Sequence, residues 1–129
     1  MDTAEILIVD DEPINLTVLR NLLTRHYIVR ACKSGSDALS LIASGRRPDL
    51  ILLDIIMPGL SGYDTLTRLR ETEENRDIPV IFITAFPQRL LTGERPEPAF
   101  LITKPYSEEQ VRSAVSQAMF FASTEDMRV

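Results

Sequence analysis

Residues able to take part in phosphoryl chemistry follow four short apolar runs of this 129-residue chain, in the order Asp10 with Asp11, Asp54, Thr84 and Lys104. Carboxylates bind hard cations and can attack phosphorus, a hydroxyl can donate to a phosphoryl oxygen, and a lysine can neutralise the phosphoryl charge. In an α/β sheet of parallel strands, functional groups gather at the carboxyl ends of the strands. The order of these residues therefore predicts one phosphorylation site assembled from four strands.

Three carboxylates at one sheet edge repel one another, and a cation relieves that repulsion. We expect Mg²⁺, which Mn²⁺ could replace, because hard oxygen ligands on few side chains suit it better than zinc, for which His26 and Cys32 supply no cluster. Asp11 and Asp54 are the expected direct ligands, and Asp10 is expected to act mainly through water. With its charge neutralised, the Asp54 carboxylate can attack a phosphoryl donor in line and become an aspartyl phosphate.

Each of these residues also has an ordinary structural interpretation. An Asp-Asp pair after a strand is commonly a turn, Thr84 alone is commonly a cap, and Lys104 alone is commonly a solvated charge. Asp54 is harder to explain in this way, because a carboxylate inside the apolar stretch Leu50–Ile56 is costly to bury without a partner. The order of the residues and their placement after strands favour the functional interpretation.

The elements that must position these residues alternate between strands and helices. Continuously apolar runs predict buried parallel strands, with a shorter edge strand at Tyr27–Val29, and the buried runs are Ile6–Val9, Leu50–Leu53, Val80–Ile83 and Phe100–Ile102. Apolar residues at helical spacing predict helices whose buried faces carry Ile14, Val18, Leu19, Leu22 and Leu23; Ala38, Leu39 and Ile42; Tyr63, Leu66 and Leu69; and Val111, Ala114, Val115, Ala118 and Met119. An open α/β sheet built from five strand-helix units follows.

Local signals refine the helices. Ser61 with Asp64, and Ser107 with Gln110, predict capping boxes at two helix starts. The fourth helix should be short or irregular, because only residues 88–92 are uninterrupted by proline or glycine in a segment that contains Pro87, Gly93, Pro96 and Pro98.

Composition predicts one domain over residues 1–122, followed by a fraying tail over residues 123–129. The net charge of -5 disfavours nucleic acid as a partner. The apolar stretch Leu50–Ile56 is far shorter than the roughly 20 residues of a membrane span. With Cys32 as the single cysteine and no secretion signal at the start of the chain, the expected location is the cytoplasm, without a membrane partner.

The chain resembles the CheY-like receiver domains of two-component response regulators over nearly its whole length, in the motifs Ile6–Glu12, Asp49–Asp54, Met57–Gly59 with Gly62, Thr84–Ala85 and Lys104–Pro105. The resemblance implies a (βα)₅ flavodoxin-like, doubly wound parallel five-stranded sheet with strand order 2-1-3-4-5. It implies Mg²⁺-dependent phosphorylation of Asp54 by a histidine kinase or histidine phosphotransfer protein, and a conformational signal to a downstream protein effector. It implies no enzyme activity beyond weak autophosphorylation and autodephosphorylation.

The same resemblance assigns further roles. The backbone carbonyl of Ile56 would complete the metal site, Ala85 would leave space beside the phosphate, and the Lys104–Pro105 peptide bond would be cis, which only proline makes plausible. The second half of the chain, in Thr84–Pro87, Leu91–Pro98 and Lys104–Pro105, further resembles the receivers of the general stress response regulators of alphaproteobacteria.

One departure from the receiver pattern bears on signalling. Leu101 stands three positions before the lysine, where many receivers carry an aromatic switch residue, and Phe100 should face the opposite side of the strand. We therefore predict that signalling uses rearrangement of residues 86–98. Ile56 and Phe86 are both apolar and flank the route of water to the phosphate, which predicts a long-lived phosphoryl state.

Expected contact surfaces lie on two sides of the predicted site. A kinase would meet the first helix near Pro13, Ile14 and Asn15, and the output surface would be formed by the fourth and fifth elements, with Phe120 and Phe121 extending an apolar patch.

Three other functions compete with phosphoacceptance. The first is a receiver fold that serves only as an unphosphorylated docking module. The second is a metal-dependent phosphohydrolase with Asp54 as nucleophile, which lacks an evident general acid and cap. The third is a flavodoxin-like FMN binder, disfavoured because the loop after the first strand is rich in Asp where a phosphate cradle needs Gly, Ser and Thr.

Overall fold

A five-stranded parallel sheet is the centre of the computed structural model, which describes residues 3–85 and 100–126 and the side chains up to residue 120. The strands are β1 (Glu5–Val9), β2 (Ile28–Cys32), β3 (Leu50–Asp54), β4 (Val80–Thr84) and β5 (Phe100–Thr103). They lie in the order β2-β1-β3-β4-β5, and every neighbouring pair is parallel. The predicted fold class and strand order are confirmed.

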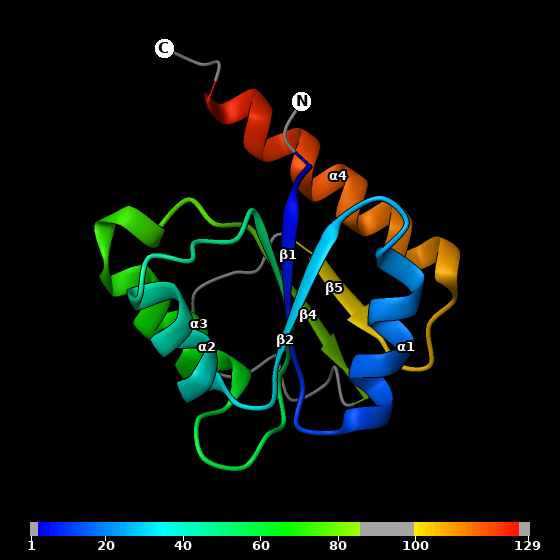
Figure 1. Ribbon diagram of the computed structural model, residues 1–129, viewed down its shortest axis with the longest axis horizontal. Helices are drawn as coiled ribbons and strands as arrows, with labels where there is room; N and C mark the ends of the chain where they lie inside the picture. The colour runs from blue at the N-terminus through cyan, green and yellow to red at the C-terminus, as the bar shows by residue number, and fades with distance from the viewer. Residues whose placement is uncertain (1–2, 86–99, 127–129) are drawn as a thin grey trace.

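Helices cover both faces of this sheet. α1 (Pro13–Leu23) and α4 (Glu108–Asp126) lie on one face, while α2 (Gly35–Ala43) and α3 (Gly62–Glu71) lie on the other (Figure 1). A short 3₁₀ turn, Glu73–Asn75, follows α3. The predicted irregular fourth helix and the predicted rearrangement of residues 86–98 lie outside the described residues, so α4 here is the helix expected to be the last one.

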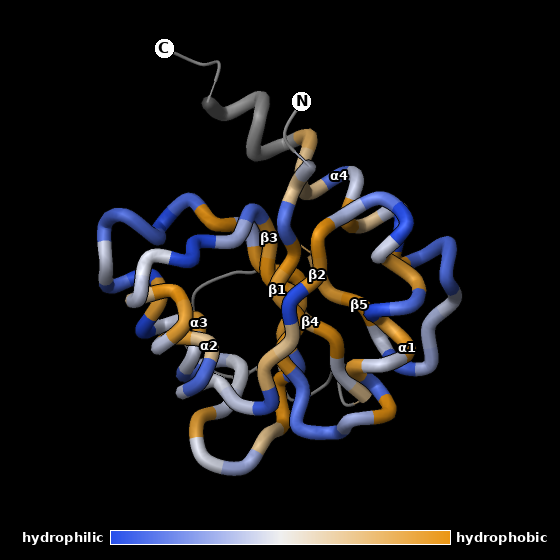
Figure 2. Tube along the Cα trace, in the orientation of Figure 1, coloured by the Kyte–Doolittle hydropathy of each residue, from blue (hydrophilic) through white to orange (hydrophobic). Residues whose placement is uncertain are grey.

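Alternating strand residues build two separate cores. One set packs against α1 and α4 and comprises Ile6, Ile8, Leu50, Leu52, Ile81, Ile83 and Ile102. The opposite set packs against α2 and α3 and comprises Leu7, Val9, Ile51, Leu53, Val80 and Phe82. Because both faces are covered, the interiors of the central strands β1, β3 and β4 are apolar on both sides, and hydrophobic colour runs along these strands in Figure 2.

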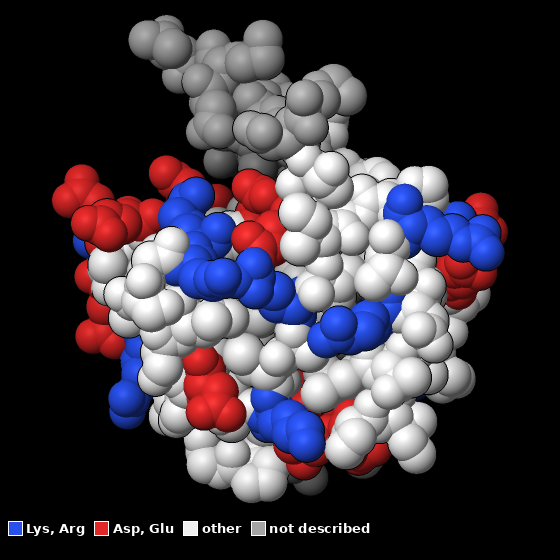
Figure 3. All heavy atoms as spheres, in the orientation of Figure 1, with Lys and Arg blue, Asp and Glu red and all other residues white. Residues whose placement is uncertain are grey.

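The edge strand β2 is less covered than the central strands, as its sequence predicts, since none of its residues is fully buried. Arg30 of this strand forms an ion pair with Glu5 of β1. The visible face also carries a band of basic side chains, with acidic groups around it (Figure 3). Charged side chains beside an open edge disfavour pairing with the edge strand of another molecule.

The buried face of α1 differs from the predicted one. Leu16, Leu19 and Leu23 are buried, whereas Ile14 and Val18 are 75% and 46% exposed. The prediction combined two neighbouring rows of side chains on the helix. The row with Leu19 and Leu23 packs against the sheet, whereas Ile14 and Val18 in the other row face away from it. The predicted faces of α3 and α4 are confirmed, with Tyr63, Leu66 and Leu69 buried on α3 and Val111, Ala114, Val115 and Ala118 on α4.

Both predicted capping boxes are present. The Ser61 hydroxyl accepts from the Asp64 backbone N–H at 3.1 Å, and the Asp64 carboxylate accepts from Ser61 N at 3.4 Å. Ser107 and Gln110 make the same reciprocal pair at the start of α4. None of the described helices is long and apolar enough to cross a bilayer.

Candidate functional site

The predicted site residues follow adjacent strands at their carboxyl ends. Asp10 follows β1, Asp54 ends β3, Thr84 ends β4, and Lys104 follows β5. Backbone hydrogen bonds continue past the strands, from Lys104 N to Thr84 O at 2.8 Å and from Asp10 N to Cys32 O at 3.1 Å. The ladder of the sheet therefore fixes the backbone from which these side chains project.

Three carboxylates meet at this edge. The carboxylate oxygens of Asp10, Asp11 and Asp54 all lie within 4.8 Å of one another. Asp10 is 2% exposed and Asp54 is 8% exposed, so two of the three groups are largely withdrawn from water. Burial raises the pKa of Asp54 from its ordinary value of 3.8 to about 6; the Asp10 carboxylate also raises it, and the Lys104 ammonium opposes the rise.

The Lys104 ammonium lies between two of these carboxylates. Its Nζ is 3.5 Å from Asp10 Oδ2 and 3.7 Å from Asp54 Oδ2. These distances are longer than direct charge-assisted hydrogen bonds, so the lysine is shared between the two acids rather than committed to one. A cation placed in this way can move to a newly attached anionic group without crossing the site.

Backbone groups hold the two buried carboxylates from the other side. Ile55 N donates to Asp54 Oδ1 at 2.8 Å, and Glu12 N donates to Asp10 Oδ1 at 3.0 Å. In each acid the second oxygen, Oδ2, is therefore the one nearer the lysine. The orientation of both carboxylates is set by the chain that immediately follows them.

Gly62, at the start of α3, rests directly against the backbone of the loop that carries Asp54. A Cβ at this position would lie 2.5 Å from the Asp54 carbonyl oxygen and 2.8 Å from the Ile55 Cα. Gly62 N also donates to Ile55 O at 2.8 Å. Only glycine allows this approach, so α3 forms a fixed support beneath Asp54.

The donor set of the acidic cluster fits a hard divalent cation. All three groups offer carboxylate oxygens, and no His or Cys belongs to the cluster within the part of the chain that the structure describes. The raised pKa of Asp54 shows that Lys104 does not fully offset the burial and repulsion of the cluster. Oxygen ligands of this kind suit Mg²⁺, which usually keeps several waters when one or two carboxylates hold it.

The other predicted features of the site are placed as follows. Thr84 is buried at the end of β4, one residue after Ile83, which pairs with Asp54 of β3. Ile56 is 42% exposed in the loop after β3, and Ala85 is exposed beyond β4. The Lys104–Pro105 bond is cis, as expected. The roles of Thr84, Ile56 and Ala85 stay predictions.

Leu101 and Phe100 face opposite sides of β5, in agreement with strand alternation. Phe100 packs against the cluster covered by α1 and α4, while Leu101 is 42% exposed. The position at which the resemblance to receivers predicts an aromatic switch residue is therefore occupied here by an exposed leucine.

Sequence reasoning missed the role of one residue in this site. Asn15 was assigned only to a contact surface, but its Nδ2 donates to Asp10 Oδ2 at 3.1 Å and lies 3.5 Å from Glu12 Oε2. A signal was available, because side chains in a helix point back toward its N-terminus, and α1 begins at Pro13 beside the acidic pair.

A parallel sheet in the order 2-1-3-4-5, with acids and a lysine at its carboxyl edge, defines the class of flavodoxin-like α/β proteins with an acidic site beyond the strands. The family model of the response regulator receiver domain matches residues 6–116. The chain belongs to this family, which is a signalling domain of two-component systems.

Individual relatives agree with the family. The chain is 45% identical to the phyllosphere-induced regulator PhyR of Methylorubrum extorquens, over 91% of this chain and 44% of that protein. It is 34% identical to protein PilH of Pseudomonas aeruginosa, over 90% and 98% of the two chains. The solution structure of the Erythrobacter litoralis PhyR receiver domain is 41% identical, with a TM-score of 0.79, and the match covers 94% of this chain and 93% of that one.

The chain thus spans less than half the length of the M. extorquens PhyR that it matches, and nearly all of PilH. The resemblance of its second half to the general stress response receivers of alphaproteobacteria is in line with the PhyR matches.

Proposed function

We propose that the protein accepts a phosphoryl group on Asp54 from the phosphohistidine of a histidine kinase or histidine phosphotransfer protein, and passes a conformational signal to a protein effector. The observation that carries this proposal is the shared lysine. A cation lies 3.5 and 3.7 Å from two buried carboxylates at one sheet edge, where a third acid completes a cluster within 4.8 Å.

In the proposed reaction a bond forms between an Asp54 carboxylate oxygen and phosphorus. The bond between phosphorus and the donor imidazole nitrogen breaks, and its electron pair returns to the imidazole. Mg²⁺, or Mn²⁺ in its place, would neutralise carboxylate and phosphoryl charge, held by Asp11, Asp54, the Ile56 carbonyl and, through water, Asp10. Lys104 and Thr84 would then bind phosphoryl oxygens.

A donor protein is proposed to dock on α1. Ile14 and Val18 lie one turn apart and are 75% and 46% exposed, on the helix that begins directly after the acidic pair. Asn15, next to Ile14, contacts Asp10. An apolar surface beside the phosphoacceptor would bring a phosphohistidine to Asp54 while burying little charge.

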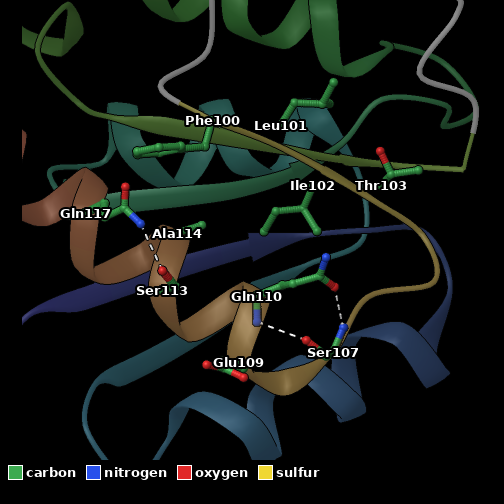
Figure 4. A pocket seen from close by; sticks show the side chains of 10 residues that line it. All are labelled: Phe100, Leu101, Ile102, Thr103, Ser107, Glu109, Gln110, Ser113, Ala114 and Gln117. Atoms are coloured by element: carbon green, nitrogen blue, oxygen red, sulfur yellow. Dashed lines mark hydrogen bonds between the residues drawn. The ribbon is translucent and has the colours of Figure 1, made fainter.

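The effector is proposed to bind on the side formed by β5 and α4. Residues of the edge strand β5 and of α4 line a groove of about 520 Å³ (Figure 4). Leu101 of the strand and Gln110, Ser113 and Gln117 of the helix are among the lining residues. Phe120 of α4 is also exposed, whereas the side chain of Phe121 lies outside the described residues.

The wider setting follows the sequence expectations. We propose that residues 1–122 act as one receiver unit in the cytoplasm. The start of the predicted tail at residue 123 falls inside α4, which continues to Asp126. Nucleic acid is not proposed as a partner, because the chain carries a net charge of -5. A membrane is not proposed as a partner, because the apolar stretch Leu50–Ile56 is far shorter than the roughly 20 residues of a membrane span. Beyond weak autophosphorylation and autodephosphorylation, no enzyme activity is proposed.

The deciding experiment is the intact mass of the protein after incubation with acetyl phosphate, with Mg²⁺ or with EDTA. We expect a gain of one phosphoryl group that requires Mg²⁺ and is lost in Asp54→Ala. Asp37→Ala is the matched control, because Asp37 is an exposed carboxylate on α2 that does not belong to the cluster of Asp10, Asp11 and Asp54. No gain in any condition would refute phosphoacceptance and favour the docking module.

A further inference from the structure

We propose that Asn15 is a positioning residue that orients the Asp10 carboxylate and thereby sets the affinity of the site for Mg²⁺. The inference rests on the proposed function, because it concerns the metal that the phosphoacceptor needs. Asn15 is not one of the residues already assigned to the site, which are the three acids, Thr84 and Lys104.

The contacts of Asp10 show why its orientation depends on Asn15. Glu12 N donates to one oxygen, Oδ1, at 3.0 Å, and Asn15 Nδ2 donates to the other, Oδ2, at 3.1 Å. Lys104 Nζ lies 3.5 Å from that same Oδ2. Without the Asn15 amide, Oδ2 would keep the Lys104 ammonium, and at this distance the lysine constrains the carboxylate weakly.

The chemistry of the donor matters as much as its position. A primary amide is neutral, so it fixes the carboxylate plane without offsetting the negative charge that a metal needs. A second lysine or an arginine at this place would hold Asp10 equally well but would compete with the cation. Residues that hydrogen-bond to metal-binding groups in this way commonly change metal affinity about 10- to 100-fold when they are replaced.

The helix holds the amide in place. Asn15 lies in the first turn of α1, and its neighbour Leu16 is buried in the core that α1 shares with the sheet. Leu19 and Leu23 extend this contact along the helix. Because the helix is anchored on one side and Asp10 on the other, the Asn15 amide needs little further ordering to reach its acceptor.

Asn15→Leu tests the proposal, because leucine has a similar shape and no donor. Asn21→Leu is the matched control, since Asn21 is an exposed asparagine on the same helix. The readouts are Mg²⁺ titration of the unphosphorylated protein, followed by the amide NMR signals of Asp11 and Glu12, and Mn²⁺ binding followed by electron paramagnetic resonance. We expect Asn15→Leu to weaken both affinities about tenfold and Asn21→Leu to leave them unchanged.

Kinetics separate metal affinity from a general structural defect. With acetyl phosphate, Asn15→Leu should need about tenfold more Mg²⁺ for half-maximal phosphorylation. At saturating Mg²⁺ its rate should return to nearly that of the wild type. If Asn15→Leu binds Mg²⁺ as tightly as the wild type, the inference is overturned and the proposed function stands. The same holds if saturating Mg²⁺ does not restore the phosphorylation rate of Asn15→Leu. A wild type that neither binds Mg²⁺ nor gains a phosphoryl group overturns both.

Discussion

Replacing Asp54 by asparagine should stabilise the metal-free protein at neutral pH, although it abolishes the phosphoacceptor. The pKa of Asp54 is raised to about 6, chiefly by burial and then by repulsion from Asp10. Asparagine keeps the oxygen that accepts from Ile55 N and removes the charge. The fold therefore loses a repulsive group and keeps its local hydrogen bond.

The magnitude follows from the pKa. A rise from 3.8 to about 6 corresponds to about 3 kcal/mol, since each pKa unit is worth about 1.4 kcal/mol. A carboxyl with a higher pKa in the folded state destabilises the fold only where it is ionised. The cost is absent below the unfolded pKa of 3.8, grows as the pH rises toward 6, and is complete above it. Screening at the sheet edge lowers our expectation to roughly 1 to 3 kcal/mol.

Urea unfolding in EDTA measures this effect directly. At about pH 7.5 the free energy of unfolding of Asp54→Asn should exceed that of the wild type by roughly 1 to 3 kcal/mol, and at about pH 3.5 the two should nearly agree. Added Mg²⁺ should stabilise the wild type more than the variant. Glu71→Gln, at an exposed carboxylate of α3, is the control for removal of one negative charge. An Asp54→Asn protein that is no more stable than the wild type at about pH 7.5 would refute the reasoning.

Three further predictions follow from the supports and surfaces of the site. Gly62→Ala should lower the free energy of unfolding by about 1 to 3 kcal/mol and slow phosphorylation, because its Cβ would meet the Asp54 backbone; unchanged urea unfolding would contradict this. Ile56→Asn should shorten the phosphoryl lifetime about fivefold, measured by loss of mass with time, if its amide gains one hydrogen bond of about 1 kcal/mol to the attacking water. Ile14→Ser should weaken binding of the phosphorylated donor protein at least tenfold and leave acetyl phosphate labelling unchanged; equal loss in both assays would place Ile14 in the site itself.

The sheet was predictable because its physical requirement is simple. A strand covered on both faces must be apolar throughout, so Ile6–Val9 and Val80–Ile83 identify β1 and β4 without reference to their partners. Asp54 could be placed at a strand end for the converse reason, since a carboxylate in the middle of such a strand would have no partner.

The side-chain contacts around the site were less predictable. Periodicity located α1 but not its rotation, and it placed Ile14 and Val18 in the core although both are exposed. Apolar residues retained on a surface for partner binding look the same in a sequence as residues of the core. The Asn15 contact was missed because it depends on where the helix sits against β1, which packing decides and local spacing does not.

The separation between the strand interiors and their ends has an evolutionary consequence. Ile81 and Ile83 are enclosed by one core and Phe82 by the other, while Thr84 stands at the very end of the same strand. Substitutions in the interior are constrained by packing, whereas substitutions beyond the strand ends are constrained by chemistry and by partners. A lineage can therefore alter partner choice or signal duration at the ends of the strands while inheriting an unchanged sheet.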